Sequence, residues 1–539
     1  MLPGDTQSRD ICVPLSDLRA LLTGNSPLPL SSREVLRTSL CDVERRLQEI
    51  SGIIASQEDG LRRLNEERAR LTEFTENARA TLHPARFLPK VILAQIFQAS
   101  VDSESSGIMD MHNFPENTNS LDPSRAPWTF SQVCRQWREV ALELPSLWSY
   151  IAIDFPNVPT HDPSVSSLLG RLMLQIQRSR TQELTVLLQT LHRIHQHHPL
   201  MVAVCSHSAR WGTLRLSFAH DDPKPYHTLS SMVKRNLNGL RRLFLQPKFV
   251  DDNLSSAGII DTFVTAPQLR ELNVVGYTAL LHYHFPITFG QITHFRCELS
   301  RHTISLMNSY EYISAMSGLQ ELLLIGVFPS QDMDKGPNFT LPQLHTLSIA
   351  PKSFSVAAAR KLLDRLTAPS LHTFRVNGDV SDVECLRSFL SRCASTLKHL
   401  CLEDHGMSAP GVIRLLETIP ALESLSISSM PEDVVHALAG PSSSSDEIVH
   451  LTPKLTELCL LYPKCFMDAS LLGLVEARLH HLESSRPPVA KLRKLRFSCE
   501  MLTGIKYGTL KALEAFDELD VDFTAEAWLP EDMEGVLQD

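Results

Sequence analysis

The sequence predicts an α/β protein of 539 residues, in which a long helix and a short helical module precede a solenoid of parallel strands with helical returns. Three observations predict this class. Apolar residues recur at steps of four and three over residues 36–75, helix-spaced apolar residues cluster between 88 and 141, and one short apolar template recurs from residue 211 onward. With 43% hydrophobic residues, the chain is long enough for an extended array and too long for one compact core.

The charge of the chain is concentrated at one end. The formal net charge is −10, and residues 511–539 contain ten acidic residues and one lysine, which leaves the body close to neutral. A neutral body offers phosphate backbones no long-range attraction, so we expect no nucleic-acid partner. The acidic tail over residues 511–539 is interpreted as a solvated terminus or a polar cap, with contact to a basic partner as the alternative.

Targeting signals and cysteine usage indicate the compartment. No apolar run approaches the roughly 20 residues of a membrane span, and the N-terminus lacks the basic-then-apolar order of a signal peptide. The eleven cysteines stand singly, without a C-x-x-C pair, which suits reduced and buried thiols. We therefore expect no membrane contact and a cytoplasmic or nuclear protein.

Residues 32–82 are predicted to form a long heptad helix after a flexible leader over residues 1–31, which is rich in Pro, Ser and Gly. Nine of twelve seam positions are apolar, with Arg and Glu between them, which is typical of a coiled coil. The seam either meets its own copy in a homodimer through residues 36–75 or folds back on the rest of the chain, and the sequence leaves both open. The seam positions are Leu36, Leu40, Val43, Leu47, Ile50, Ile54, Gln57, Leu61, Leu64, Arg68, Leu71 and Thr75.

Residues 83–151 contain two apolar helices separated by a polar insertion over residues 102–127. The first begins after Leu88 and Pro89, because proline suits a first helical turn, and the second ends before Pro145. Two short helices cannot bury so many large apolar groups between themselves. Either another chain or domain covers part of them, or they are ordinary core helices. The helix-spaced residues are Val91, Ile92, Ile96 and Phe97 in the first helix and Phe130, Val133, Cys134, Trp137, Val140 and Ala141 in the second.

This stretch resembles an F-box, specifically the fungal F-box-like type. The order Leu-Pro, Ile-Phe, Val-Cys-Arg-x-Trp-Arg and Leu-Trp carries the resemblance, at residues 88–89, 96–97, 133–138 and 147–148. The resemblance implies a three-helix module that docks on the Skp-type adaptor of a cullin-based ubiquitin ligase. Trp148 is instead expected to join the module to the first strand of the array. On this resemblance the adaptor-binding residues are Leu88, Pro89, Ile92, Leu93, Ile96, Phe97, Val133, Trp137 and Val140.

Residues 152–510 are predicted to form a repeat array. After strands expected at residues 150–153 and 183–188, an apolar-x-x-apolar-x-apolar template recurs at intervals of 23 to 37 residues. Each unit supplies a short strand and a helical return, such as 356–366 or 383–390, and stacked units bury each other's apolar edges. The eleven units begin at Trp211, Leu240, Leu269, Ile292, Leu319, Leu344, Leu371, Leu397, Leu422, Leu455 and Leu492.

The array resembles a leucine-rich repeat solenoid. It lacks the asparagine that such repeats place after the third apolar position, so we expect the turns to be satisfied in another way and the arc to be irregular. The two longest intervals contain residues 440–447 and 486–488, which are interpreted as loop insertions. The serine run Ser442, Ser443, Ser444 and Ser445 is interpreted as an unmodified loop, with phosphorylation as the alternative.

No catalytic or metal-binding motif is present in the sequence. There is no G-x-S-x-G, H-E-x-x-H, Gly-Lys-Ser or G-x-G-x-x-G pattern, and no cysteine or carboxylate completes a set with the densest histidine cluster. We expect a substrate-recognition subunit of a Skp-cullin-F-box ubiquitin ligase, without a catalytic, cofactor or metal site, whose repeats hold an unknown protein substrate. The alternative is a non-ligase repeat scaffold that self-associates through the heptad helix. The histidine cluster is His192, His195, His197 and His198.

Overall fold

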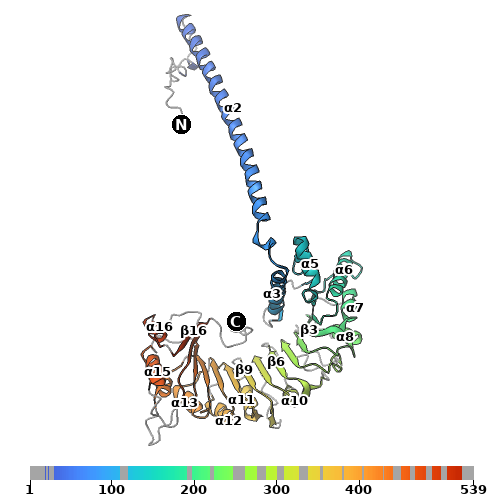
Figure 1. Ribbon diagram of the computed structural model, residues 1–539, viewed down its shortest axis with the longest axis vertical. Coiled ribbons are helices and arrows are strands. Elements are labelled where there is room, and N and C mark those ends of the chain that lie inside the picture. Colours follow the sequence, from blue (N-terminus) through green and yellow to red (C-terminus); the bar gives the residue numbers. More distant parts are fainter. Residues whose placement is uncertain are drawn as a thin grey trace. The chain divides into compact units, whose positions relative to one another are not determined.

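The computed structural model confirms the predicted α/β class, with a long N-terminal helix and a parallel sheet with helical returns (Figure 1). The chain falls into two compact units, Met1–Pro89 and Lys90–Asp539. The structure describes residues 19, 22–23, 30–109, 119–190, 197–218, 224–246, 261–275, 287–299, 309–326, 338–351, 356–378, 382–403, 406–428, 430–440, 451–461, 468–480, 489–498, 507–516 and 518–524.

The N-terminal unit is dominated by one helix, α2 (Leu30–Thr81), of 52 residues, followed by the short 3-10 helix η1 (Pro84–Arg86). The predicted leader lies almost wholly outside the described residues. Large apolar side chains of α2 are exposed along its length, for example Leu47 at 58% and Leu61 at 61%. The sequence pattern that predicted the helix therefore also marks a face that this unit leaves uncovered.

The second unit begins with the helical module, which we define as α3 (Lys90–Met109), α4 (Phe130–Val133), α5 (Arg135–Glu143) and the 3-10 helix η2 (Pro145–Trp148). The polar insertion was expected to begin at residue 102, but α3 continues through Met109. Polar residues can extend a helix wherever it faces solvent, and Gln98 donates a hydrogen bond along α3 to Asp102 at 2.8 Å.

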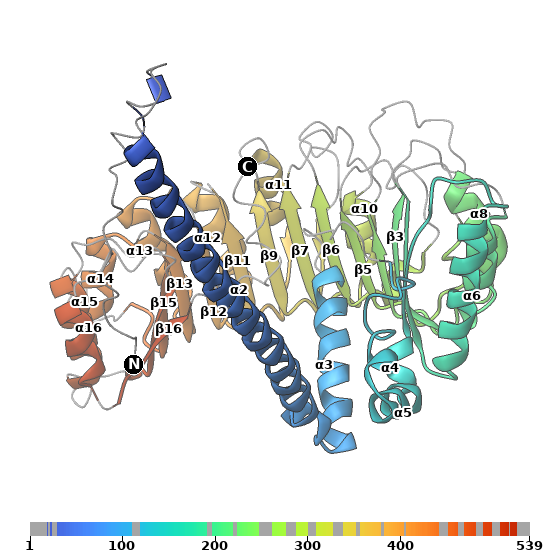
Figure 2. The same ribbon diagram turned by 90° about the horizontal axis from the view of Figure 1, so that it is seen from above.

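One fourteen-stranded sheet runs through the rest of the unit, and every strand pairs in parallel with its neighbours. Figure 2 shows the strands side by side, and Figure 1 shows the helical returns α10 to α13 along one side of them. Strand order follows chain order, which is the arrangement expected of a solenoid that adds one strand per repeat. The strands are β1 (Tyr150–Asp154), β2 (Leu184–Thr190), β3 (Trp211–Phe218), β4 (Arg242–Leu245), β5 (Glu271–Val275), β6 (His294–Leu299), β7 (Glu321–Gly326), β9 (Thr346–Pro351), β11 (Thr373–Asn377), β12 (His399–Glu403), β13 (Ser424–Ser428), β14 (Glu457–Leu461), β15 (Lys494–Ser498) and β16 (Asp520–Thr524).

Each of the eleven predicted units supplies one strand, from β3 to β15. In the unit that contains β11, the three template positions Leu371, Phe374 and Val376 are at most 1% exposed. They belong to one apolar core that continues through the neighbouring repeats. Because alternate strand residues point to one face, the template predicts which side chains face the helices.

Helical returns cover the apolar side of the sheet, as predicted for residues 356–366 and 383–390, where α11 and α12 lie. The apolar stripe of α12 is buried against the core through Leu386, Phe389 and Leu390. A separate two-stranded sheet pairs β8 (Phe339–Thr340) with β10 (Leu366–Thr367). The returns are α6 (Pro163–Arg178), α7 (Pro199–Cys205), η3 (Ser208–Arg210), α8 (Lys224–Val233), η5 (Phe289–Gln291), α10 (Ser309–Ala315), α11 (Val356–Arg365), α12 (Val383–Ser391), α13 (Ala409–Glu417), α14 (Glu432–Ala439), α15 (Asp468–His480) and α16 (Tyr507–Glu514).

Arginines donate hydrogen bonds to carbonyls at the corner between a helical return and the next strand. Arg210 Nε donates to the Gln182 carbonyl at 3.0 Å, in the preceding repeat. Arg392 donates in the same way to the carbonyls of Leu363 and Leu366. Long side chains with several donors therefore satisfy carbonyls at the corner before a strand, which is not the corner after the strand where the asparagine is missing.

Arg478 on α15 is the most buried of these arginines, at 2% exposed. Its Nε donates to the Leu438 carbonyl at 2.9 Å, and its two terminal nitrogens donate to the carbonyls of Leu451 at 2.8 Å and Thr452 at 3.3 Å. Burial lowers the pKa of Arg478 to about 10, so the guanidinium remains charged at neutral pH.

We expect Arg478→Met to lower the unfolding free energy of the C-terminal repeats by about 2–3 kcal/mol, because several buried carbonyls lose their donor while the side-chain stem is kept. Hydrogen exchange of β14 and β15 amides measures the loss. The matched control is Arg493→Met, since Arg493 is an exposed arginine of the next repeat. Equal protection in the two variants would contradict the structural role of Arg478.

The sheet continues past residue 510, where the sequence predicted that the array would end. Strand β16 pairs in parallel with β15, and the register places Asp520 opposite Lys494 and Asp522 opposite Arg496. The nearest charged atoms of both pairs are 3.7 Å apart. Part of the predicted acidic tail is therefore the last strand of the solenoid, because its acidic side chains complement basic ones on the neighbouring strand.

Candidate functional site

The helical module has an aromatic interior. Phe97 of α3 stacks on Phe130 of α4 with ring centroids 4.2 Å apart and planes at 6°. Trp137 of α5 lies against both rings, at 4.9 Å from Phe97 and 6.4 Å from Phe130. Three rings from three helices thus fix the packing of the module, since aromatic pairs in such geometries add to the energy of burial.

Polar contacts fasten the same helices at their surface. Lys90 Nζ lies 3.2 Å from Glu139 Oε2, which joins the start of α3 to α5, and Arg135 Nε lies 3.2 Å from Glu139 Oε1. The hydrogen bond from Lys90 and the charge of Lys90 hold the pKa of Glu139 below its usual value. Ser146 of η2 donates to Gln98 Oε1 of α3 at 2.6 Å. These exposed contacts orient the helices more than they stabilise them.

A second aromatic cluster joins the module to α6, the first helical return. Trp148, which is fully buried, donates its Nε1 proton to the Ala141 carbonyl at 2.8 Å and meets Trp128 edge to face at 5.1 Å. The guanidinium carbon of Arg178 on α6 lies 4.3 Å from the Trp148 ring centroid and 5.2 Å from that of Trp128. Trp148 therefore joins α5 to α6, the first helical return, and its predicted link to the first strand stays a prediction.

Residues of the predicted polar insertion protect the open edge of the sheet. The backbone N–H of Ser120 donates to the Ala152 carbonyl of β1 at 2.9 Å, and the Ser120 hydroxyl accepts from the Ala152 N–H at 2.9 Å. Gln175 of α6 donates to the Tyr150 carbonyl at 2.6 Å. Sequence reasoning missed this role, although Leu121 and Trp128 are large apolar residues in and beside a polar stretch. Covering an edge strand in this way blocks pairing with other chains.

The structure divides the nine predicted adaptor-binding residues into three groups. Leu93, Phe97 and Val140 are at most 3% exposed, so they hold the module together and offer no surface to a partner. Phe97 was expected to bind the adaptor, and this role needs correction because Phe130 and Trp137 already pack against its ring. The remaining residues are the partly buried Leu88 and Trp137 and the exposed Pro89, Ile92, Ile96 and Val133.

An apolar surface remains after the module has filled its own interior. Ile92 and Ile96, one helical turn apart on α3, are 40% and 46% exposed, and Val133 on α4 is 59% exposed. Val91 is 68% exposed and was not among the predicted binding residues, although it belongs to the same helix-spaced run. We call Val91, Ile92, Ile96 and Val133 the module surface. Isolated apolar residues are common on proteins, but Ile92 and Ile96 lie one helical turn apart on the same side of α3, which favours a binding role.

The face of the sheet opposite the helical returns is largely polar. The register aligns Arg215, Phe244, Asn273 and Arg296 on β3 to β6. Further along, Asn377 donates to Glu403 Oε2 at 2.9 Å. Alternation places these side chains away from the apolar core, so strand residues that differ from unit to unit determine what this face can bind.

Other candidate sites are weaker. No cluster of three or more His, Cys, Asp or Glu in the described ranges could hold a metal ion. His192, His195 and the serine run at 442–445 lie outside the described residues, whereas His198 accepts a hydrogen bond from the Leu200 N–H at the start of α7. Six of the eight described cysteines are buried, and burial raises the pKa of Cys205, Cys297 and Cys393 to about 12, which disfavours thiolate chemistry.

Fold and site together define a class: a solenoid repeat protein with a helical module at the first edge of its sheet and a long N-terminal helix. No helix within the described ranges has the length and apolar character that crossing a bilayer requires.

Comparisons with known proteins add little to this description. The chain matches no protein-family model and no curated protein. Among solved structures, it is similar to the crystal structure of a Rad7 and Elc1 complex in yeast, with 12% sequence identity, a TM-score of 0.35, and coverage of 84% of this chain and 97% of that chain. A TM-score at this level carries no argument about function.

Proposed function

We propose that this protein is the substrate-recognition subunit of a Skp-cullin-F-box ubiquitin ligase, active in the cytoplasm or nucleus. The F-box resemblance of residues 88–148 motivates the proposal. The observation that carries it is the module surface, where Val91, Ile92, Ile96 and Val133 stay exposed although the three-ring interior beneath them is complete. A helix face of this kind suits a groove on a second protein, here the Skp-type adaptor.

In this proposal, different parts of the chain have different roles. The module binds the adaptor, the sheet holds a target protein, and the Trp148 cluster joins the two so that the target stays at a defined distance from the module. In this role the chain forms no covalent bond and needs no cofactor. It acts by proximity, because holding two reactants together raises their effective concentration.

The test uses the full chain and a purified Skp-type adaptor. We expect Ile92→Glu with Ile96→Glu to weaken adaptor binding at least a hundredfold, because covering these side chains contributes about 1 kcal/mol each and a buried unpaired carboxylate costs more. Biolayer interferometry measures the affinity. Both side chains are already exposed, so the substitutions should leave the fold intact.

The matched control adds the same two charges elsewhere in the unit. Met173→Glu with Val202→Glu replaces side chains that are 47% and 45% exposed on α6 and α7, and it should bind the adaptor like the wild type. Equal binding by both double variants would remove the adaptor claim. A wild-type chain that self-associates but binds no adaptor would favour the repeat scaffold instead.

A further inference from the structure

We infer that the protein forms a parallel, in-register homodimer through the seam of α2. The inference starts from an uncovered face: Leu40, Leu47, Ile54 and Leu61 on the seam are 50–61% exposed. A helix of 52 residues at about 1.5 Å per residue is about 78 Å long, and most helical stability in proteins comes from packing of an apolar face. This helix therefore needs a partner of similar length.

A second α2 is the occupant that matches. Among the described helices the next longest is α3, with 20 residues, and repeat helices such as α12 and α13 already bury their apolar stripes against the sheet. A coiled coil brings about four residues of every seven into contact, so two copies of α2 would each contribute about 30 residues, which matches a stable interface of roughly 20–30 residues per side.

The charges of α2 are arranged on the outside of such a pair. With Leu40, Leu47, Ile54 and Leu61 as first positions of successive heptads, the ion-paired side chains fall mainly on positions that point away from the seam. Arg63 lies 2.6 Å from Asp59, and Arg62 lies 3.9 Å from Glu66. Because these charged side chains pair within α2 on its outward side, the apolar seam is the face that remains for another chain. The outward-pointing members are Asp42, Arg45, Glu49, Asp59, Arg62, Arg63 and Glu66.

The two polar seam positions favour parallel chains. In a parallel pair, Gln57 meets Gln57 of the other copy, so one amide can donate to the other, whereas in antiparallel pairing about the seam's midpoint it would face Ile54. Arg68 would sit beside the carboxylate of Glu67 on the other copy, because a first-position side chain packs next to the residue that precedes its counterpart. Polar seam residues of this kind fix register and strand direction.

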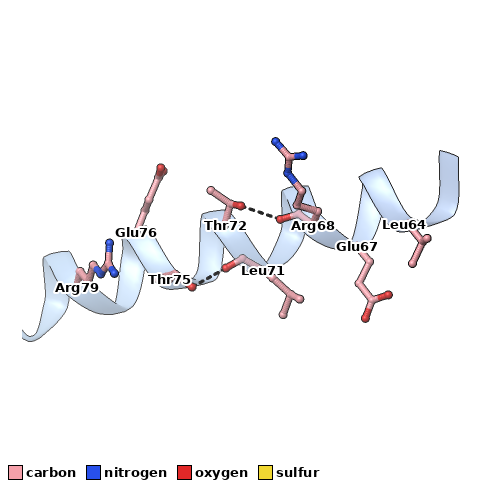
Figure 3. A pocket seen from close by; sticks show the side chains of 8 residues that line it. All are labelled: Leu64, Glu67, Arg68, Leu71, Thr72, Thr75, Glu76 and Arg79. Carbon is pink, nitrogen blue, oxygen red and sulfur yellow. Dashed lines mark hydrogen bonds between the residues drawn. The ribbon is translucent and has the colours of Figure 1, made fainter. Parts of the chain in front are cut away.

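Seam leucines of α2 project from the same side of the helix (Figure 3). Figure 3 shows Leu64 and Leu71 pointing off the same side of α2, where both line a shallow depression. Seam residues Arg68 and Thr75 line it as well, so four consecutive seam positions surround one depression. In the inferred dimer, a seam side chain of the other copy would insert between these four residues. Dimerisation through α2 does not depend on adaptor binding, so the variant Ile92→Glu, Ile96→Glu should remain a dimer.

Analytical ultracentrifugation of the full chain tests the oligomeric state. The chain mass is 60.4 kDa, so a dimer of two copies has about 121 kDa. We expect the wild type to be dimeric and Leu47→Glu with Leu61→Glu to be monomeric. The control Ala55→Glu with Ala69→Glu adds the same charges on the outward side and should stay dimeric. A monomeric wild type, or equal masses for both variants, would overturn the proposal.

Disulfide trapping tests the direction of the chains. With the exposed Cys41 and Cys134 replaced by serine, together with Cys12, Cys465 and Cys499 outside the described residues, Leu64→Cys should yield a covalent dimer on oxidation, because the two copies of residue 64 face each other only in a parallel, in-register pair. Ala69→Cys, which points outward, should not cross-link. Absence of the Leu64→Cys cross-link in a protein that sediments as a dimer would refute the parallel arrangement.

Discussion

Replacing Trp148 by alanine is expected to lower the unfolding free energy by about 3–5 kcal/mol, the usual cost of deleting a fully buried tryptophan side chain. Loss of the Trp148 ring should affect more of the fold than loss of an ordinary core side chain, because the ring contacts three separate parts of the chain. It meets Trp128 edge to face, lies under Arg178 and bonds to the Ala141 carbonyl. Without the Trp148 ring, the module and the first repeats lose the packing that they share.

Hydrogen exchange locates this effect. Amides of β1 and β2 should lose most protection, because η2 contacts β1 and α6 directly, while the distant repeats β13 to β15 should change little. Trp148→Phe is the control: it keeps an aromatic ring but loses the hydrogen bond to Ala141, so its cost should be about 1–3 kcal/mol. Uniform loss of protection across the whole sheet would contradict a local junction.

Phe97→Ala is expected to lower the stability of the helical module by about 3–5 kcal/mol, because Phe97 is fully buried and its ring stacks on Phe130 and packs against Trp137. Limited proteolysis and hydrogen exchange over α3 and α5 measure this loss. Adaptor binding should fail as a consequence of unfolding and not through a lost contact.

Ile96→Ala separates the two roles of α3. Ile96 is the neighbour of Phe97 but is 46% exposed, so its truncation should change stability by less than about 1 kcal/mol while weakening adaptor binding. The pair of variants therefore distinguishes a core residue from a surface residue one position away. If Phe97→Ala left the exchange of α3 unchanged, the three-ring interior would not be what holds the module.

Residue patterns with a fixed period could be interpreted from the sequence. The template around Leu371, Phe374 and Val376 gave strand and inward face correctly, because a strand alternates with period two and the solenoid repeats that alternation in every unit. The heptad of α2 gave its helix for the same reason. Both are local rules, so they need no knowledge of distant residues.

Burial in the helical module could not be predicted in this way. Helical spacing placed Ile92, Ile96 and Phe97 in one apolar run, but which of them faces inward depends on where α4 and α5 lie. The covering of the β1 edge by Ser120 and the packing of Trp128 also depend on residues far away in the sequence. Ser120 bonds to backbone atoms of β1, and Trp128 packs against the ring of Trp148.

The sequence by itself determined the α/β class, the long seam of α2 and the register of apolar positions in the repeats, because each follows from side-chain periodicity within a short stretch. Only the tertiary structure decided that Phe97 is interior while Ile96 is exposed. It also decided that Arg478 donates to turn carbonyls and that acidic residues near the C-terminus form strand β16 beside β15. Those outcomes depend on contacts between residues far apart in the chain, and periodicity carries no information about such contacts.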